Sequence, residues 1–302
     1  MRAANLLKVF TCCFALMAAS PSFAQGLTTF NNGEIADADE INNNFSVLNS
    51  RLNNVENMNF GFLGNNIQAY KLVEVDCSGN AAALSQAWEA NYATNQIKFL
   101  INGRCEWPYP DVGFSGKSVI ISGAADAECP AVLPSIEATS LAIAYGGLWL
   151  KCLEFDSDTF IASYANGYVR LENVTKTTPD QTITVLIRNN STLRVFGTTQ
   201  LSDVQAAGGS HVTLRPYAAP SIEKLQLLAS STLWCNYCSG DINLLKLRDG
   251  SDASFTPAGS GLSVTTLDAA QGARISVNAV NGDVIIANEI LAENATVYRR
   301  SE

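Results

Sequence analysis

One hydrophobic pattern recurs along the chain at nearly constant intervals. A short polar or glycine-containing step precedes an apolar, variable, apolar triplet, and the triplet begins at Leu148, Val169, Leu193, Val212, Leu233, Ala253, Ile275 and Val297. The intervals are 21, 24, 19, 21, 20, 22 and 22 residues. A sustained period of this length predicts a solenoid, because each unit cannot bury its apolar face alone and must stack on the next.

A second apolar ladder accompanies the first, at Leu201, Ile222, Ile242, Leu262 and Val284. Two ladders in one repeat mean that each unit contains at least two strands, and a unit of about 21 residues has room for three short ones. The pattern predicts an all-β fold, a right-handed single-stranded parallel β-helix over residues 61–302. A leucine-rich repeat is disfavoured because its asparagine and leucine ladder is missing.

Residues 1–24 predict a secretory signal peptide. Arg2 and Lys8 give the positive start, an apolar stretch runs from Val9 to Ala19, and Ala24 ends a small-x-small cleavage site. The apolar stretch is too short to span a bilayer. We therefore expect an exported chain without a membrane span, located in the periplasm, at the cell surface or outside the cell.

Residues 25–60 predict a helical appendage in front of the solenoid. A helix this short is marginal alone in water, so its apolar seam requires a partner. Two partners remain open: the first coil of the solenoid, which the helix would cap, or the same helix of sister subunits, which would give a homo-oligomer such as a trimer. The seam follows heptad spacing, at Ile41, Phe45, Leu48, Leu52 and Val55.

The opening of the predicted solenoid combines strands with one helical segment. Apolar runs at 71–75, 97–101 and 118–122 are bounded by turn residues, and a helical pattern covers 81–92. The segments VEVDCSGNAAALSQAW, IKFLINGRC and VIISGA resemble the first coils of exported bacterial proteins of the pectate-lyase-like superfamily, over about residues 71–124. This resemblance implies a β-helix. The preceding FNNGEIADADEINNNFSVLNSRL resembles an oligomerising or connecting module found before exported bacterial β-helix and fibre domains.

Composition narrows the choice of partner. Removal of Arg2 and Lys8 with the signal peptide leaves 17 of the 19 basic residues against 28 acidic ones, a mature net charge of −11. This charge argues against nucleic acid or an anionic membrane as the general partner.

Six cysteines follow the predicted signal peptide, and an even number in an exported chain predicts disulfides. Residues about one coil apart stack in neighbouring coils, whereas distant coils cannot be bridged. Cys152 with Cys235 is disfavoured because four coils of roughly 4.8 Å separate them by about 19 Å, against a limit near 7 Å between α-carbons. A redox role for the CNYC segment is disfavoured because no thioredoxin-like βαβ pattern surrounds it. The favoured pairs are Cys77 with Cys105, Cys129 with Cys152, and Cys235 with Cys238.

Strand alternation identifies one outer surface, because side chains alternate across a strand and the middle residue of each triplet should point outward. These middle residues are Trp149, Arg170, Arg194, Thr213, Trp234, Ser254, Ser276 and Tyr298. Outward positions two residues earlier or later add Tyr168, His211, Arg274, Lys151, Glu172, Phe196 and Arg215. Arginine and aromatic side chains therefore meet on one face of an acidic protein.

This face is a candidate groove for an anionic polysaccharide. Arginine forks suit carboxylate or sulfate groups, and large exposed aromatic side chains often mark binding sites. The alternative is a solvated face on which the arginines only shield the edges of the coils. The candidate substrate-binding residues are Trp149, Tyr168, Arg170, Arg194, His211, Arg215 and Trp234.

An acidic segment lies just after the first tryptophan of this face. Glu154, Asp156 and Asp158 alternate with other residues, so their carboxylates should share one face of a strand. Three hard oxygen ligands are a candidate calcium site, and lyases of the superfamily that the chain resembles commonly use calcium. The alternative is a solvated acidic face without an ion.

No complete catalytic set is present in the sequence. The GHG and DD motifs of polygalacturonase-type hydrolases are missing, and Glu172 and Asp252 on the outer face lie four coils apart, whereas hydrolysis needs two carboxylates at a fixed separation. A lyase could use Lys151, Arg170 or Arg194 as its base beside calcium. We expect a secreted or cell-surface glycan-binding protein without catalysis. The alternatives are a calcium-dependent lyase for an acidic polysaccharide and a structural fibre or adhesin component.

Overall fold

The structure is a computed structural model that describes residues 70–107, 114–123, 128–215, 218–279 and 282–300. These residues belong to one compact unit. The predicted signal peptide (1–24) and the predicted helical appendage (25–60), with its capping or oligomerising role, lie outside the described residues. No helix in the described ranges is long and apolar enough to cross a membrane.

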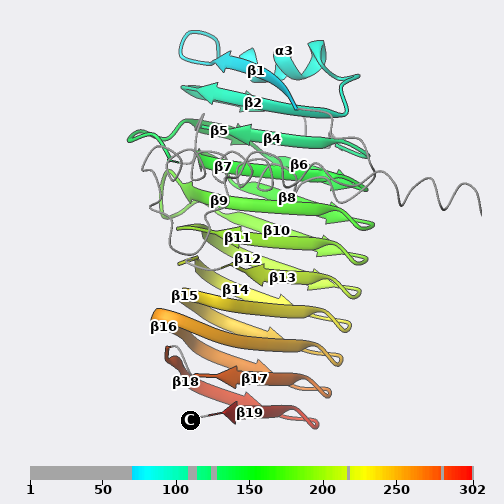
Figure 1. The fold of residues 1–302 in the computed structure, drawn as a ribbon, viewed down its shortest axis with the longest axis vertical. Coiled ribbons are helices and arrows are strands. Elements are labelled where there is room, and N and C mark those ends of the chain that lie inside the picture. Colours follow the sequence, from blue (N-terminus) through cyan, green and yellow to red (C-terminus); the bar gives the residue numbers. More distant parts are fainter. Residues whose placement is uncertain (1–69, 108–113, 124–127, 216–217, 280–281, 301–302) are drawn as a thin grey trace, which may run out of the picture. The chain divides into compact units, whose positions relative to one another are not determined.

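The chain winds into a parallel β-solenoid of about 10 turns, whose coils stack along the long axis in Figure 1. All strands belong to one parallel sheet, which confirms the all-β prediction. The helix is α3 (Ala83–Ala90). The strands are β1 (Lys71–Asp76), β2 (Gln96–Asn102), β3 (Arg104–Trp107), β4 (Ser118–Ser122), β5 (Ser135–Ala138), β6 (Ser140–Ala144), β7 (Gly147–Phe155), β8 (Thr159–Tyr164), β9 (Tyr168–Lys176), β10 (Ile183–Arg188), β11 (Thr192–Phe196), β12 (Gln200–Ala207), β13 (His211–Leu214), β14 (Ser221–Leu227), β15 (Thr232–Leu247), β16 (Asp252–Ala269), β17 (Arg274–Asn278), β18 (Val284–Leu291) and β19 (Thr296–Arg300).

The strand register reproduces the first apolar ladder of the sequence. Leu148 pairs with Val169, Val169 with Leu193, and the pairing continues coil by coil to Val297. All members except Val297 are at least 98% buried. The period of the sequence is therefore the length of one coil.

The second ladder departs from the prediction at one step. Leu201 pairs with Ile222 and Ile222 with Ile242, as expected, but Ile242 pairs with Val264, and Leu262 pairs with Gly240. The register shifts around Cys238 and Gly240 cause this slip of two residues. Because two residues restore the same side of a strand, the apolar side chains still point inward.

A repeated corner precedes the outer-face strand in four successive coils. Each corner contains two consecutive residues with positive φ, such as Asn189 and Asn190 at 58° and 62°. A fully buried serine follows, and its hydroxyl donates a hydrogen bond of 2.6–2.7 Å to the carbonyl three residues earlier. The polar residues that precede each apolar triplet thus form a turn, and the buried serine hydroxyl in that turn binds one of its backbone carbonyls. The serines are Ser191, Ser210, Ser231 and Ser251.

The N-terminal end of the described solenoid is covered. Helix α3 contacts β1 and β3, and its Leu84 and Trp88 are 0% and 2% exposed. The Trp88 ring meets Phe114 edge to face, with centroids 4.9 Å apart. This helix confirms the helical pattern at 81–92 and closes the apolar core at that end.

Three disulfides join the cysteines as the coil geometry predicts. The α-carbons of Cys77 and Cys105 are 5.2 Å apart, those of Cys129 and Cys152 5.3 Å, and those of Cys235 and Cys238 5.6 Å. The first links Cys77, which directly follows β1, to Cys105 in β3, and the third lies within β15.

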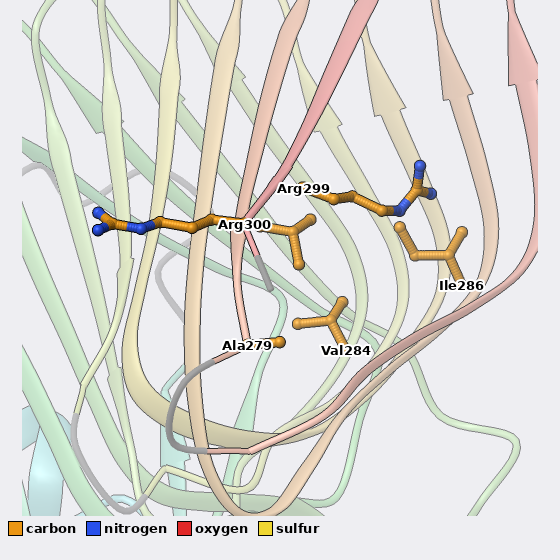
Figure 2. A pocket seen from close by; sticks show the side chains of 6 residues that line it. Ala279, Val284, Ile286, Arg299 and Arg300 are labelled. Carbon is orange, nitrogen blue, oxygen red and sulfur yellow. The ribbon is translucent and has the colours of Figure 1, made fainter. Parts of the chain in front are cut away.

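The C-terminal end has a different construction. Arg299 pairs in register with Val277, and Glu289 with Leu267, so both occupy inward columns that are apolar in the preceding coils. The two side chains form an ion pair across the last coil. An opening of about 260 Å³ lies at this end, and Figure 2 shows Arg299 and Arg300, which line it, extending to opposite sides. Charge therefore terminates the apolar core here, where no helix covers it among the described residues.

Candidate functional site

The outer face predicted from strand alternation is present, and we call it the strip. Its central column runs in register through Trp149, Arg170, Arg194, Thr213, Trp234, Ser254, Ser276 and Tyr298. These residues come from β7, β9, β11, β13, β15, β16, β17 and β19, which lie in successive coils. The strip therefore follows the solenoid axis, at about 4.8 Å per coil.

Cations and aromatic rings alternate in the first four coils of the strip. The guanidinium carbon of Arg170 lies 4.0 Å from the ring centroid of Trp149 and 4.0 Å from that of Phe196. Arg215 approaches the other side of Phe196 at 5.7 Å. Each contact is within the range of a cation–π interaction. The stack fixes flexible side chains in place, because their planar groups are held between rings.

A second such pair lies beside this stack. The guanidinium carbon of Arg194 is 5.2 Å from the ring centroid of Tyr168. Burial raises the pKa of the Tyr168 hydroxyl above its ordinary value, while the charges of Arg194 and Arg170 oppose the shift. The hydroxyl is thus held in its neutral form close to two cations.

One carboxylate serves two of the cations. Glu172 is 2.6 Å from an Arg170 nitrogen and 3.5 Å from Lys151 Nζ. The Lys151 and Glu172 side chains are only 11% and 15% exposed. Lys151 and Arg170, both candidates for a lyase base, are therefore engaged in ion pairs.

The first four coils carry an excess of positive charge, and we call this part the cationic half. Its four cations, Lys151, Arg170, Arg194 and Arg215, face the single carboxylate of Glu172. Arg194 and Arg215 form no ion pair with the residues that the structure describes. Partial burial and the neighbouring charge of Arg194 lower the pKa of Arg215 below its ordinary value. The like charges are thus only partly compensated.

The last four coils of the strip differ in chemistry and shape, and we call them the serine groove. Ser254 and Ser276 lie in register between Trp234 and Tyr298. The two rings are 57% and 61% exposed. The small serines leave a hollow of about 620 Å³, which is also lined by Thr232, Leu233, Asp252, Ala253, Arg274 and Ile275.

His211 lies between the two parts of the strip. Its Nδ1 is 2.7 Å from the hydroxyl of Thr232 in the next coil. The side chain is exposed. The only histidine of the chain therefore lies on the strip with a hydroxyl partner in the neighbouring coil.

The seven residues predicted as substrate-binding are spread along the strip from β7 to β15. Trp149, Tyr168, Arg170, Arg194 and Arg215 lie in the cationic half, and His211 and Trp234 lie where it meets the serine groove. The site prediction missed Phe196 and Tyr298, although alternation placed both on this face. A search guided by large exposed aromatic side chains would have included Tyr298.

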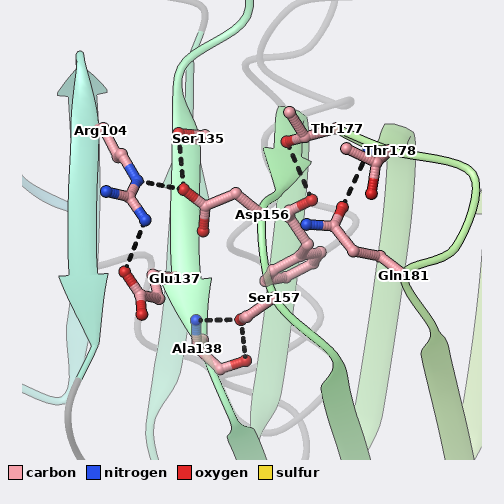
Figure 3. A network of polar contacts seen from close by, with 10 residues as sticks. Arg104, Ser135, Glu137, Ala138, Asp156, Ser157, Thr177, Thr178 and Gln181 are labelled. Atoms are coloured by element: carbon pink, nitrogen blue, oxygen red, sulfur yellow. Dashed lines mark hydrogen bonds and ion pairs between the residues drawn. The ribbon is translucent and has the colours of Figure 1, made fainter.

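Two of the three carboxylates of the candidate calcium site, Asp156 and Asp158, take separate partners. Asp156 forms an ion pair with Arg104, which also binds Glu137 at 2.7 Å (Figure 3). Asp158 accepts hydrogen bonds from the backbone nitrogen and hydroxyl of Thr182, at 2.8 and 3.0 Å. Asp156 and Asp158 lie beyond the end of β7, where strand alternation no longer applies. In the described ranges, no group of three or more His, Cys, Asp and Glu residues is arranged to hold a metal ion.

Comparison with known proteins adds no name to this arrangement. The chain matches no protein-family model, no curated protein and no solved structure.

Proposed function

We propose that this chain is an exported, non-catalytic protein that binds an anionic polysaccharide along the strip. The observation that carries the proposal is the excess positive charge of the cationic half, whose four cations are only partly compensated by Glu172. Arg194 and Arg215 have no carboxylate partner among the described residues, and partial burial together with the charge of Arg194 lowers the pKa of Arg215. An anionic ligand would relieve this repulsion, and guanidinium groups bind carboxylate or sulfate in a bidentate manner.

The shape and surroundings of the strip favour a sugar polymer over other anions. The strip crosses successive coils at a regular spacing, so it suits a ligand with a repeating charge. Aromatic rings accompany the cations at each step. The rest of the chain is acidic, which disfavours a long nucleic acid with its dense backbone charge.

Disulfides and the predicted signal peptide support an exported location for this function. Three disulfides are typical of oxidising compartments. We also propose membership of the pectate-lyase-like superfamily. The parallel β-solenoid supports it, as does the resemblance of residues 71–124 to the first coils of that superfamily.

The experiment that tests this function is retention on immobilised polygalacturonate and heparin. Arg194→Ala with Arg215→Ala should weaken binding by about tenfold or more, because each charge-assisted contact contributes more than a neutral one. The matched control, Arg188→Ala with Lys246→Ala, removes two cations outside the strip and should bind like the parent. Equal retention of both double variants would refute the strip as the site.

A calcium-dependent lyase remains the alternative function on the same surface. It would release an unsaturated product from an acidic polysaccharide when calcium is present. We give binding priority because Lys151 and Arg170 are both held by Glu172. Product formation that is lost in Arg194→Ala would replace the binding proposal with the enzyme.

A further inference from the structure

We infer that the serine groove binds an uncharged stretch of the same polysaccharide whose acidic groups bind the cationic half. This inference rests on the proposed function and assigns a second subsite to it. The polysaccharide would then lie along the solenoid axis and would carry both acidic and uncharged sugars.

The first argument is the exposure of the two rings. Trp234 and Tyr298 are 57% and 61% exposed, and exposed apolar surface rimmed by polar residues often marks a ligand-binding groove. By contrast, Trp149 at the other end of the strip is covered by Arg170 at 4.0 Å. The faces of Trp234 and Tyr298 are available for the apolar face of a sugar ring.

The second argument is the shape between the rings. Three coil steps separate Trp234 from Tyr298, about 14 Å at the usual strand spacing. The hydroxyls of Ser254 and Ser276 form the floor of the intervening hollow of about 620 Å³. A leucine or arginine at either position would occupy part of it. The chain therefore has rings at both ends of a depression and hydrogen-bonding groups along its floor.

The third argument is charge. The lining of the serine groove includes one cation and one anion, Arg274 and Asp252, whose side chains lie 3.4 Å apart and are 66% and 48% exposed. The groove is therefore neutral, whereas the cationic half has four cations and one carboxylate. A neutral surface rich in hydroxyls suits sugar hydroxyls, and it offers no compensation for a ligand charge.

Three polymers test this assignment on the full mature chain. Polygalacturonate is acidic at every sugar, hyaluronan is acidic at every second sugar, and dextran is uncharged. Trp234→Ala, Tyr298→Ala and Ser254→Leu should each weaken hyaluronan binding by about tenfold, which corresponds to about 1.4 kcal/mol. Their binding to polygalacturonate should change by less than about twofold, because the cationic half remains intact. Tyr145→Asn, an exposed turn residue beside the first coil of the strip, is the control and should bind all three polymers like the parent.

The outcomes separate this inference from the proposed function. Groove variants that bind hyaluronan like the parent, while Arg194→Ala with Arg215→Ala loses it, would overturn the groove and leave the cationic site standing. Parent protein that binds polygalacturonate but not hyaluronan would also overturn the groove. If the parent protein bound neither polygalacturonate nor hyaluronan, both proposals would be overturned.

Discussion

The guanidinium carbon of Arg170 lies 4.0 Å from the ring centroid of Phe196, in the next coil of the solenoid. The same guanidinium lies 4.0 Å from Trp149 in the preceding coil. Three consecutive coils are thus connected on their outer face by one cation between two rings. This contact joins units whose other links are backbone pairing and core packing.

Phe196→Ala should destabilise the protein and weaken anion binding together. It removes ring contacts with Arg170 and Arg215, and we expect a loss of about 2 kcal/mol in the free energy of unfolding. Urea denaturation of Phe196→Ala, Arg170→Ala and the double variant measures the coupling. If the two single losses simply add, Phe196 and Arg170 are not energetically coupled.

Stability should fall at alkaline pH through Tyr168. Its raised pKa means that folding favours the neutral hydroxyl. The resulting stabilisation is fully present below about pH 10, the ordinary tyrosine pKa, and is lost as the pH rises through the raised value. Tyr168→Phe should therefore lose less stability than the parent above about pH 10, as measured by urea midpoints. Tyr298→Phe removes an exposed hydroxyl and should behave like the parent, so an equal effect of the two variants would contradict this account.

Gly240 should tolerate no side chain. Its φ is 111°, and an added Cβ would lie 2.4 Å from the Pro220 carbonyl oxygen. We expect Gly240→Ala to cost about 3 kcal/mol, from steric overlap and an unfavourable φ. Gly272 also has a positive φ, 72°, but its added Cβ meets nothing within 4 Å, so Gly272→Ala should cost only about 1 kcal/mol. If Gly240→Ala and Gly272→Ala lowered the thermal midpoint equally, the structure would accommodate the added Cβ beside Pro220 without extra cost.

The ion pair at the C-terminal end should keep that end monomeric. Arg299 and Glu289 occupy inward columns, and inward-pointing charges are a known protection of sheet edges. Arg299→Leu with Glu289→Leu would extend the apolar core to the last described coil, and we expect association that increases with concentration in sedimentation velocity. Arg300→Leu, outside these columns, is the control. An unchanged mass for the double leucine variant would show that the pair has no protective role.

Sequence reasoning predicted the coils because their apolar ladders require a fixed length per turn. It failed at Leu262, since the register shift near Gly240 changes pairing without changing the inward direction of the side chains. Apolar spacing records which side a residue faces. It does not determine which inward-facing residue of the neighbouring coil pairs with it.

The strip was predictable for the same reason, but its internal contacts were not. Alternation places Arg170 and Phe196 on one face, whereas their stacking depends on side-chain rotamers and on coil register. The acidic segment illustrates the converse. Asp156 meets Arg104, which is 52 residues earlier in the chain, and this partner is set by the stacking of coils.

The unequal ends of the solenoid give its unfolding a direction. A solenoid coil contacts only its neighbours, so opening begins at the less protected end and advances coil by coil. Helix α3 and the Cys77–Cys105 disulfide secure one end, whereas β18 and β19 have largely exposed side chains at the other. Amide protons of the last coils should therefore exchange first. The serine groove lies on these coils, and a polysaccharide bound between Trp234 and Tyr298 would hold the fraying end closed.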